Sequence, residues 1–148
     1  MKKVYILRGV SGSGKSTFIK KLPKNRVVHS TDKFFYKKGK YKFDVKKLGI
    51  YHQKNFEEFV KSLKKGKKNI VIDNTNLRYK NVKKYVTEAK KNGYRVILVD
   101  FKPKSALWHY KRNVHSVPKY VIKRQIKDYK KYKKTFEKAA DKIIKGNK

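Results

Sequence analysis

The stretch Gly9-Val10-Ser11-Gly12-Ser13-Gly14-Lys15-Ser16-Thr17 decides how this chain folds, because it matches G-x-x-x-x-G-K-[ST] at every fixed position. It follows the apolar run Val4–Leu7, which indicates a strand, and it leads into the helical pattern Lys15–Leu22. A glycine-rich turn between a strand and a helix lets backbone N–H groups curl around a phosphate. The sequence therefore predicts a phosphate-binding loop, or P-loop, at this place.

Two residues at the end of this loop have specific expected roles. The Lys15 ammonium should reach the β- and γ-phosphates of ATP, which makes Lys15 a catalytic candidate, and the Ser16 hydroxyl should hold Mg²⁺. The remaining nucleotide contacts in the loop are expected from Gly9, Ser11, Gly12, Ser13, Gly14 and Thr17.

Three further apolar runs, Arg26–Val28, Ile70–Ile72 and Arg95–Val99, alternate with helical patterns. Unbroken apolar runs are typical of strands that are covered on both faces of a parallel sheet. The sequence therefore predicts an α/β fold of the P-loop NTPase, nucleotide-kinase-like type. We expect a three-layer sandwich with a four-stranded parallel sheet in the order 2-3-1-4 and helices on both faces.

The residues after the fourth strand have a helical pattern. Ser116 is expected to cap a helix with Val117 and Pro118 in its first turn. Apolar side chains recur every seven residues at Ile122, Tyr129, Phe136 and Ile143. We expect this helix to run to about residue 145 and to pack on the sheet; a partner-binding helix is the alternative. The chain is expected to form one domain over residues 1–148, with a lid near 104–118 and a C-terminal helical segment over 118–145.

Positive charge dominates the composition, with 44 Lys and Arg against 10 Asp and Glu and a formal net charge of +34. Such a charge attracts polyanions in a salt-sensitive, sequence-independent way. Only six of the 44 are arginine, so an AT-rich coding bias is an equally good cause of the lysine excess. There is no cysteine, which excludes disulfides and cysteine-ligated metal sites.

Hydrophobic segments long enough for a membrane are missing from the sequence, since no run approaches 18 apolar residues. The N-terminal apolar run ends after four residues, too early for a signal peptide. We expect no membrane partner and an intracellular protein, in cytoplasm or nucleus, of cellular or viral origin.

Aspartates stand at the ends of three expected strands: Asp32, Asp73 and Asp100. The carboxyl ends of parallel strands line the ligand crevice of an open α/β sheet. A kinase needs a carboxylate to accept the proton of the attacking hydroxyl, so Asp32 is the candidate general base; a helix cap is the alternative. Asp73 could hold a water on Mg²⁺ or orient the acceptor, and Asp100 is expected to be structural.

Tyr36, Tyr41 and Phe43 alternate with lysines, which fits either base stacking or a half-buried hairpin.

The chain resembles the P-loop kinase family, of the AAA ATPase type, that contains the 5′-hydroxyl kinase domains of phage polynucleotide kinases. The matching segments over about residues 2–125 are the P-loop, His29–Phe35, Gly39–Asp44, Asp73–Asn76 and Arg112–Pro118. The resemblance implies that Asp32 is the base for a 5′-hydroxyl. It also implies that the lid residue Arg112 is catalytic, because it touches the donor phosphates and stabilises the transferring charge. It also implies that Asp73, Thr75 and Asn76 lie beside the acceptor.

Two positions depart from the phage pattern. An arginine three residues after the catalytic aspartate contacts the acceptor phosphate in that pattern, and here this acceptor-side position is Phe35. Lys33, Lys37 or Lys38 could substitute for it. A second lid arginine is also missing, and His115 is the nearest basic residue.

The expected function is therefore transfer of the γ-phosphate of ATP, with Mg²⁺, to a 5′-hydroxyl end of DNA or RNA. One alternative is a kinase for a small-molecule hydroxyl, and another is a nucleic-acid-binding adaptor that binds ATP without transfer.

Overall fold

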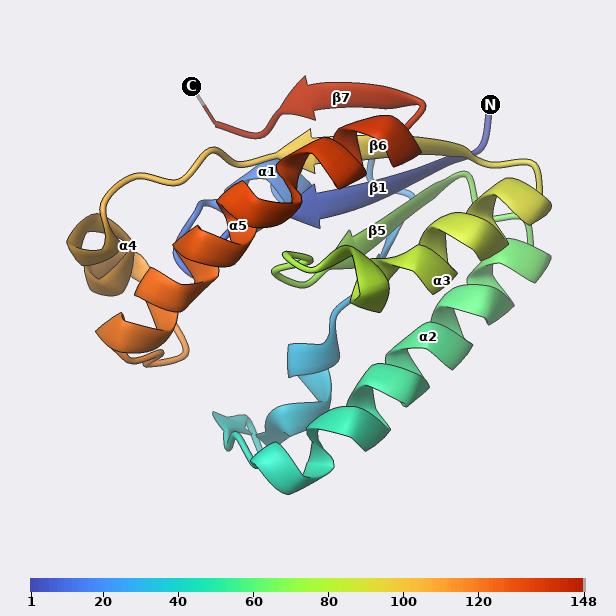
Figure 1. The fold of residues 1–148 in the computed structure, drawn as a ribbon. Coiled ribbons are helices and arrows are strands. Elements are labelled where there is room, and N and C mark those ends of the chain that lie inside the picture. Colours follow the sequence, from blue (N-terminus) through green and yellow to red (C-terminus); the bar gives the residue numbers. More distant parts are fainter. Residues whose placement is uncertain (148) are drawn as a thin grey trace.

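A parallel sheet of five strands, in the order β2-β5-β1-β6-β7, forms the centre of the computed structural model (Figure 1), which describes residues 1–147. The strands are β1 (Lys3–Arg8), β2 (Arg26–His29), β5 (Asn69–Asp73), β6 (Arg95–Asp100) and β7 (Lys142–Lys145). All four pairings between them are parallel. The carboxyl ends of the strands therefore meet at one edge of the sheet, where the P-loop begins.

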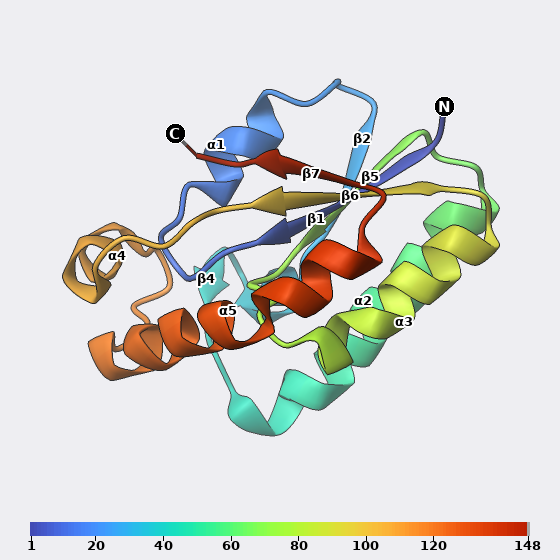
Figure 2. The same cartoon turned by 45° about the horizontal axis from the view of Figure 1, so that its top comes forward.

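Helices cover both faces of this sheet (Figure 2). The helices are α1 (Lys15–Lys20), α2 (Leu48–Lys64), α3 (Tyr79–Lys91), α4 (Ala106–Arg112) and α5 (Lys119–Ala139). Smaller elements are the 3₁₀ turns η1 (Thr31–Phe35) and η2 (Val45–Lys47) and a hairpin of β3 (Tyr36–Lys37) with β4 (Lys40–Tyr41). The expected three layers are confirmed.

Alternation along β1 shows how the layers are built. Val4 and Ile6 pack in the cluster formed with α2, α3 and α5. Tyr5 and Leu7 point to the opposite face, into the cluster that contains Ile19 of α1. All four side chains are buried, so the middle of the strand, Val4–Leu7, is buried on both faces, as is expected when helices cover both faces of a sheet.

The C-terminal segment differs from the prediction in two ways: the sheet has five strands instead of four, and the last helix ends before residue 145. The four expected strands have the order predicted for them, but α5 ends at Ala139 and the chain then forms the fifth strand, β7. The Asp141 carboxylate accepts a hydrogen bond from the Val96 amide at 2.8 Å and so starts the new strand against β6. The expected cap is also wrong: Pro118 is the N-cap residue, and Ser116 has a positive φ of 54° in the preceding turn.

A buried arginine fastens α5 beneath the P-loop. Arg8, at the end of β1, is 1% exposed and lies 4.5 Å from the Tyr129 ring centre and 4.2 Å from that of Phe136. Its Nη2 donates to the carbonyl oxygens of Leu77 and Tyr129. The Tyr129 hydroxyl in turn donates to the Asp100 carboxylate at 2.7 Å.

Within residues 1–147, no helix is long and apolar enough to cross a bilayer.

Candidate active site

A cavity of about 350 Å³ lies at the carboxyl edge of the sheet. Four parts of the chain line it: the P-loop, the turn after β2, the loop after β5, and α4 with the loop that follows. The lining residues include Ser11, Gly12, Ser13, Gly14, Lys15, Ser16, Thr17, Asp32, Asp73, Thr75 and Arg112. This position is where open parallel sheets hold their ligands.

The P-loop has the open backbone that a phosphate needs. Gly12 and Gly14 have φ angles of 77° and 92°, which side-chain-bearing residues rarely adopt. A Cβ atom on Gly14 would meet nothing within 4 Å, so this turn faces free space. The Ser13 hydroxyl donates to the Val10 carbonyl oxygen at 2.7 Å and fixes the turn from within. The loop is therefore shaped to receive an anion on its backbone amides.

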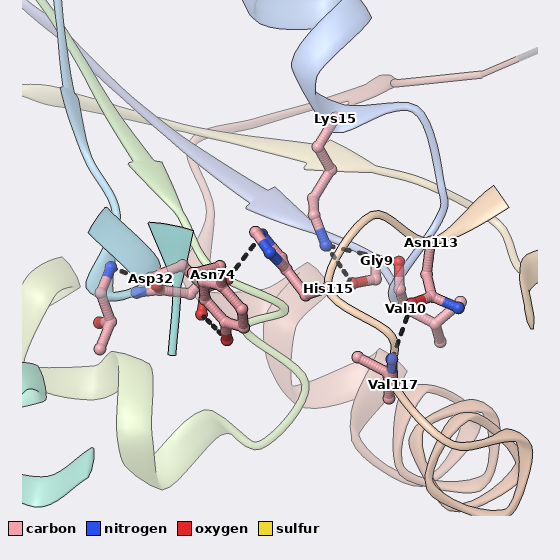
Figure 3. A network of polar contacts seen from close by, with 10 residues as sticks. Gly9, Val10, Lys15, Asp32, Asn74, Asn113, His115 and Val117 are labelled. Carbon is pink, nitrogen blue, oxygen red and sulfur yellow. Dashed lines mark hydrogen bonds and ion pairs between the residues drawn. The ribbon is translucent and has the colours of Figure 1, made fainter. Parts of the chain in front are cut away.

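The Lys15 ammonium is held at the base of the cavity (Figure 3). It donates to the carbonyl oxygen of Gly9 at 2.8 Å and, more weakly, to that of Val10 at 3.4 Å. Desolvation lowers the pKa of Lys15 to about 8, while the charges of Asp73 and Asp32 oppose this shift. An ammonium whose hydrogen-bond partners are two neutral carbonyls fits a bound phosphate.

Asp73 and Ser16 are the residues suited to a magnesium ion. Both line the cavity. Burial raises the pKa of the Asp73 carboxyl, and Lys15 counteracts that effect. Across residues 1–147 no three His, Cys, Asp or Glu side chains cluster in a way that could hold a metal. A cation here would need phosphate oxygens and water as further ligands, which is the usual coordination of Mg²⁺ with a nucleotide.

Asp32 lies across the cavity, on the turn η1 that follows β2. Its Oδ1 accepts a hydrogen bond from the Tyr41 hydroxyl at 3.1 Å, and its Oδ2 is 3.6 Å from Nε2 of His115. The side chain is 47% exposed. The Asn74 side chain accepts a hydrogen bond from the Thr31 amide at 3.0 Å and so fixes the start of η1. In the view of Figure 3, His115 lies between Asp32 and Lys15.

One buried histidine joins the lid to the P-loop. Nε2 of His109 accepts a hydrogen bond from the Lys104 amide at 2.8 Å, so the ring proton must be on Nδ1. Nδ1 then donates to the Gly12 carbonyl oxygen at 3.1 Å. Burial lowers the pKa of His109, which favours the neutral ring. The contact is close, since a Cβ on Gly12 would lie 2.5 Å from the His109 carbonyl oxygen.

The lid also brings Arg112 and Trp108 to the cavity wall. The Arg112 guanidinium lies 4.0 Å from the centre of the Trp108 ring, and its Nη1 donates to the Trp108 carbonyl oxygen at 3.1 Å. Stacking on the indole limits the directions in which this long side chain can point. Arg112 thus faces the same space as the P-loop amides.

Four of the residues expected at the site lie outside the cavity wall. Gly9 lies behind the loop, where its amide donates to the Thr75 carbonyl oxygen. Lys33 pairs with Glu58 at 2.8 Å on the surface. Phe35 is 1% exposed among other aromatic rings. The Asn76 amide donates to the carbonyl oxygens of Leu7 and Ile72 and ties the ends of two strands together.

The fold also places at the cavity or at Asp32 several residues that were not among the expected site residues. They are Tyr41, Asn74, Trp108, Asn113 and His115. Four of them lie inside matched segments, namely Tyr41, Asn74, Asn113 and His115, and Tyr41 was a candidate for base stacking. The meeting of Tyr41 with His115 was not detectable, because the two residues are far apart in the chain and belong to different elements.

The sequence of this chain is similar to a known protein family and to a human protein. Residues 4–135 match the family described as AAA domain. NEDD4-binding protein 2 from Homo sapiens is 37% identical in an alignment 136 residues long, which covers 86% of this chain. The match spans only 8% of that human protein.

Two solved structures share the fold. A chain in the structure of the Pnkp1/Rnl/Hen1 RNA repair complex superposes with a TM-score of 0.72 at 21% identity, over 91% of this chain and 46% of that one. A chain of the PezAT toxin-antitoxin system of Streptococcus pneumoniae gives a TM-score of 0.68 at 20% identity, over 98% and 68%. At these identities the likeness establishes the fold.

Proposed function

Because this chain belongs to the AAA domain family and has a P-loop kinase-like fold, we propose that it moves the γ-phosphate of ATP to a 5′-hydroxyl end of DNA or RNA. Asp32 is the general base in this proposal. The chain covers a small part of its human relative and about half of the RNA repair chain, so the proposal concerns this domain's own site.

One observation carries the proposal: Lys15, Asp32, Asp73 and Arg112 share one cavity although they come from four different segments. Two cations suit the donor phosphates, and a carboxylate across the cavity suits the acceptor hydroxyl. Phosphoryl transfer depends mainly on this kind of positioning and charge stabilisation. A site that only binds nucleotide has no use for an exposed carboxylate on the acceptor side.

Each of these residues has its own part in the reaction. The P-loop amides and Lys15 bind the donor phosphates, and Ser16 and Asp73 would hold Mg²⁺, which when bound offsets phosphate charge. Asp32 takes the proton of the acceptor hydroxyl on a carboxylate oxygen. Arg112 stabilises the charge that develops on the transferred group. The lid residues His109 and Trp108 keep Arg112 near the P-loop.

Two observations favour a nucleic acid as the acceptor. The net charge of +34 attracts polyanions whatever its evolutionary origin. One of the structural neighbours is a chain of an RNA repair complex. Neither observation distinguishes DNA from RNA, so both belong in the experiment.

The test uses γ-labelled ATP with DNA and RNA oligonucleotides that carry a 5′-hydroxyl. We expect label on the oligonucleotide with the wild-type chain, and a loss of at least about a hundredfold with Asp32→Asn. Asp128→Asn, which removes a carboxylate on α5 that pairs with Arg78, is the matched control and should keep full activity. Absence of label on both oligonucleotides, or full transfer by Asp32→Asn, contradicts the proposal.

The burial of Phe35 favours a second candidate, a kinase for a small hydroxyl compound such as a nucleoside. No guanidinium occupies the position from which related kinases contact the acceptor phosphate. In this case oligonucleotides would fail to compete with the small acceptor. Competition assays with a nucleoside acceptor separate the two candidates.

A further inference from the structure

Three aromatic rings meet on the acceptor side of Asp32. The rings of Tyr41 and His115 lie 4.1 Å apart at an angle of 30°, which is close to parallel stacking. The Tyr36 ring is arranged in a T shape to both, with its centre 5.3 Å from that of Tyr41 and 6.1 Å from that of His115. Two rings come from the β3–β4 hairpin and one from the lid loop, so this ring cluster bridges two separate parts of the chain beside one carboxylate.

The ring cluster is accessible and rigidly supported. Tyr36 is 48% exposed. The hairpin turns at Lys38 and Gly39, both with positive φ, as in the tight two-residue turns that match strand twist. The hairpin and the residue after it also carry exposed lysines, at positions 37, 38, 40 and 42. Proteins that bind unpaired bases commonly combine aromatic rings, on which the bases stack, with positively charged side chains.

Behind the rings lies an apolar support instead of a charge. Phe35 contacts Tyr41, Phe43 and Tyr51 with ring centres 6.1, 5.0 and 4.8 Å away. A buried phenylalanine cannot bind a phosphate. Phe35 instead supports the orientation of the Tyr41 ring by packing against it. The acceptor side of this site therefore suits stacking.

We propose that the ring cluster of Tyr36, Tyr41 and His115 is a subsite for the nucleobase next to the acceptor hydroxyl. The inference rests on the proposed function and specifies how the acceptor is held. Because the Tyr41 hydroxyl donates to Asp32, a base stacked on the cluster has its sugar close to the carboxylate. The ligand class is an unpaired nucleobase, whether of an oligonucleotide end or of a free nucleoside.

A binding experiment tests the subsite without any catalysis. The probe is an oligonucleotide with 2-aminopurine as its 5′-terminal base, whose fluorescence falls when the base stacks. Wild type and Tyr36→Phe should quench it, and Tyr36→Ala should abolish most of the quenching. Tyr120→Ala removes another exposed tyrosine, on α5 outside the ring cluster, and should behave as wild type. Equal quenching by Tyr36→Ala and wild type overturns the subsite.

A kinetic experiment tests the same contact in turnover. Acceptors with a normal or an abasic 5′-terminal sugar are compared. Loss of one stacked base should raise KM for the wild type about tenfold, with kcat changed less. Tyr36→Ala should show nearly the same KM for both acceptors. Equal KM values for both acceptors with the wild type contradict the subsite.

The outcomes separate the subsite from the proposed function. Label transfer to both acceptors with no preference refutes the subsite and leaves the kinase assignment standing. Quenching that depends on Tyr36, without transfer to any hydroxyl, refutes the kinase assignment and leaves a nucleobase site. A nucleoside arm distinguishes the ligand sources: stacking predicts that a free nucleoside competes for the ring cluster, while an abasic sugar does not.

Discussion

The imidazole of His109 donates a hydrogen bond to the Gly12 carbonyl oxygen at 3.1 Å, so the lid and the phosphate-binding loop are joined at a buried point. The other ring nitrogen, Nε2, accepts a hydrogen bond from the Lys104 backbone amide. A displacement of α4 away from the P-loop must therefore break the hydrogen bond to Gly12. The position of Arg112, farther along α4, depends on this joint.

Two glycines with the same backbone angle provide a matched test of the close contact. Gly12 and Gly39 both have φ of 77°, but a Cβ would collide with the lid backbone only at Gly12. Gly39→Ala should cost about 1 kcal/mol of stability from backbone strain alone. Gly12→Ala should cost more and weaken ATP binding at least about tenfold. Urea unfolding and nucleotide titration measure both; equal effects at the two positions would refute the contact.

Removal of the His109 ring polarity should loosen the lid specifically. His109→Phe leaves the Gly12 carbonyl and the Lys104 amide without their partner, at about 1–3 kcal/mol for each buried group. Amide exchange in α4 should speed up, and KM for ATP should rise. Leu107→Ala, on the same helix but 49% exposed, is the control and should change neither. Unchanged exchange in His109→Phe would argue against the joint.

Arg8 should be worth more to stability than any other arginine that lies on a strand. Arg8→Ala removes two hydrogen bonds and the stacking on Tyr129 and Phe136, so we expect a loss of about 3 kcal/mol or more. Arg8→Lys keeps the positive charge but loses the planar guanidinium, so its stability should lie between that of the wild type and that of Arg8→Ala. Arg95→Ala, exposed on β6, should stay within about 0.5 kcal/mol. Urea unfolding at pH 7 decides; similar losses at Arg8 and Arg95 contradict the role of Arg8.

The protein should lose stability in mild acid because of His29. This side chain is 3% exposed, and burial lowers its pKa to about 4. The unfolded chain takes up the proton near pH 6.5 and the folded chain does not, so stability falls as the pH drops from 6.5 towards 4. From pH 6.5 to 5 the loss from this group is about 2 kcal/mol.

Urea midpoints at a series of pH values test this slope. His29→Gln cannot titrate, and its free energy of unfolding should depend less steeply on pH over that interval. Parallel pH profiles for His29→Gln and wild type would exclude His29 as the source. Wild type and His29→Gln share every other titratable group, so the difference between their two pH profiles reports His29.

Most of the fold was predictable from local patterns. Four apolar runs and the P-loop sufficed for the α/β class and the order of four strands, and the resemblance to the P-loop kinase family is confirmed. The fifth strand was missed because Ile143 continues the seven-residue spacing of α5, while the Lys-Ile-Ile-Lys segment has only two apolar residues. Pairing with β6 and the Asp141 contact outweighed that spacing.

The site was predictable in part. The loop residues follow from a contiguous motif, whose geometry is local. Phe35 and Asn76 were expected at the acceptor because of their places in matched segments, but their side chains have buried partners that no segment reveals. Tyr41 and His115 required knowledge of how the hairpin and the lid meet, and long-range pairs of this kind are not encoded in spacing.

The fifth strand also affects how copies of the protein meet. A sheet ends in rows of unpaired backbone groups, which can recruit strands of other molecules. At one of the two edges of this sheet the outer row belongs to β7, which is four residues long and has Lys142 and Lys145 at its ends. Two such strands would have to bring like charges together in order to pair. The short lysine-ended strand therefore gives the sheet a border that resists aggregation.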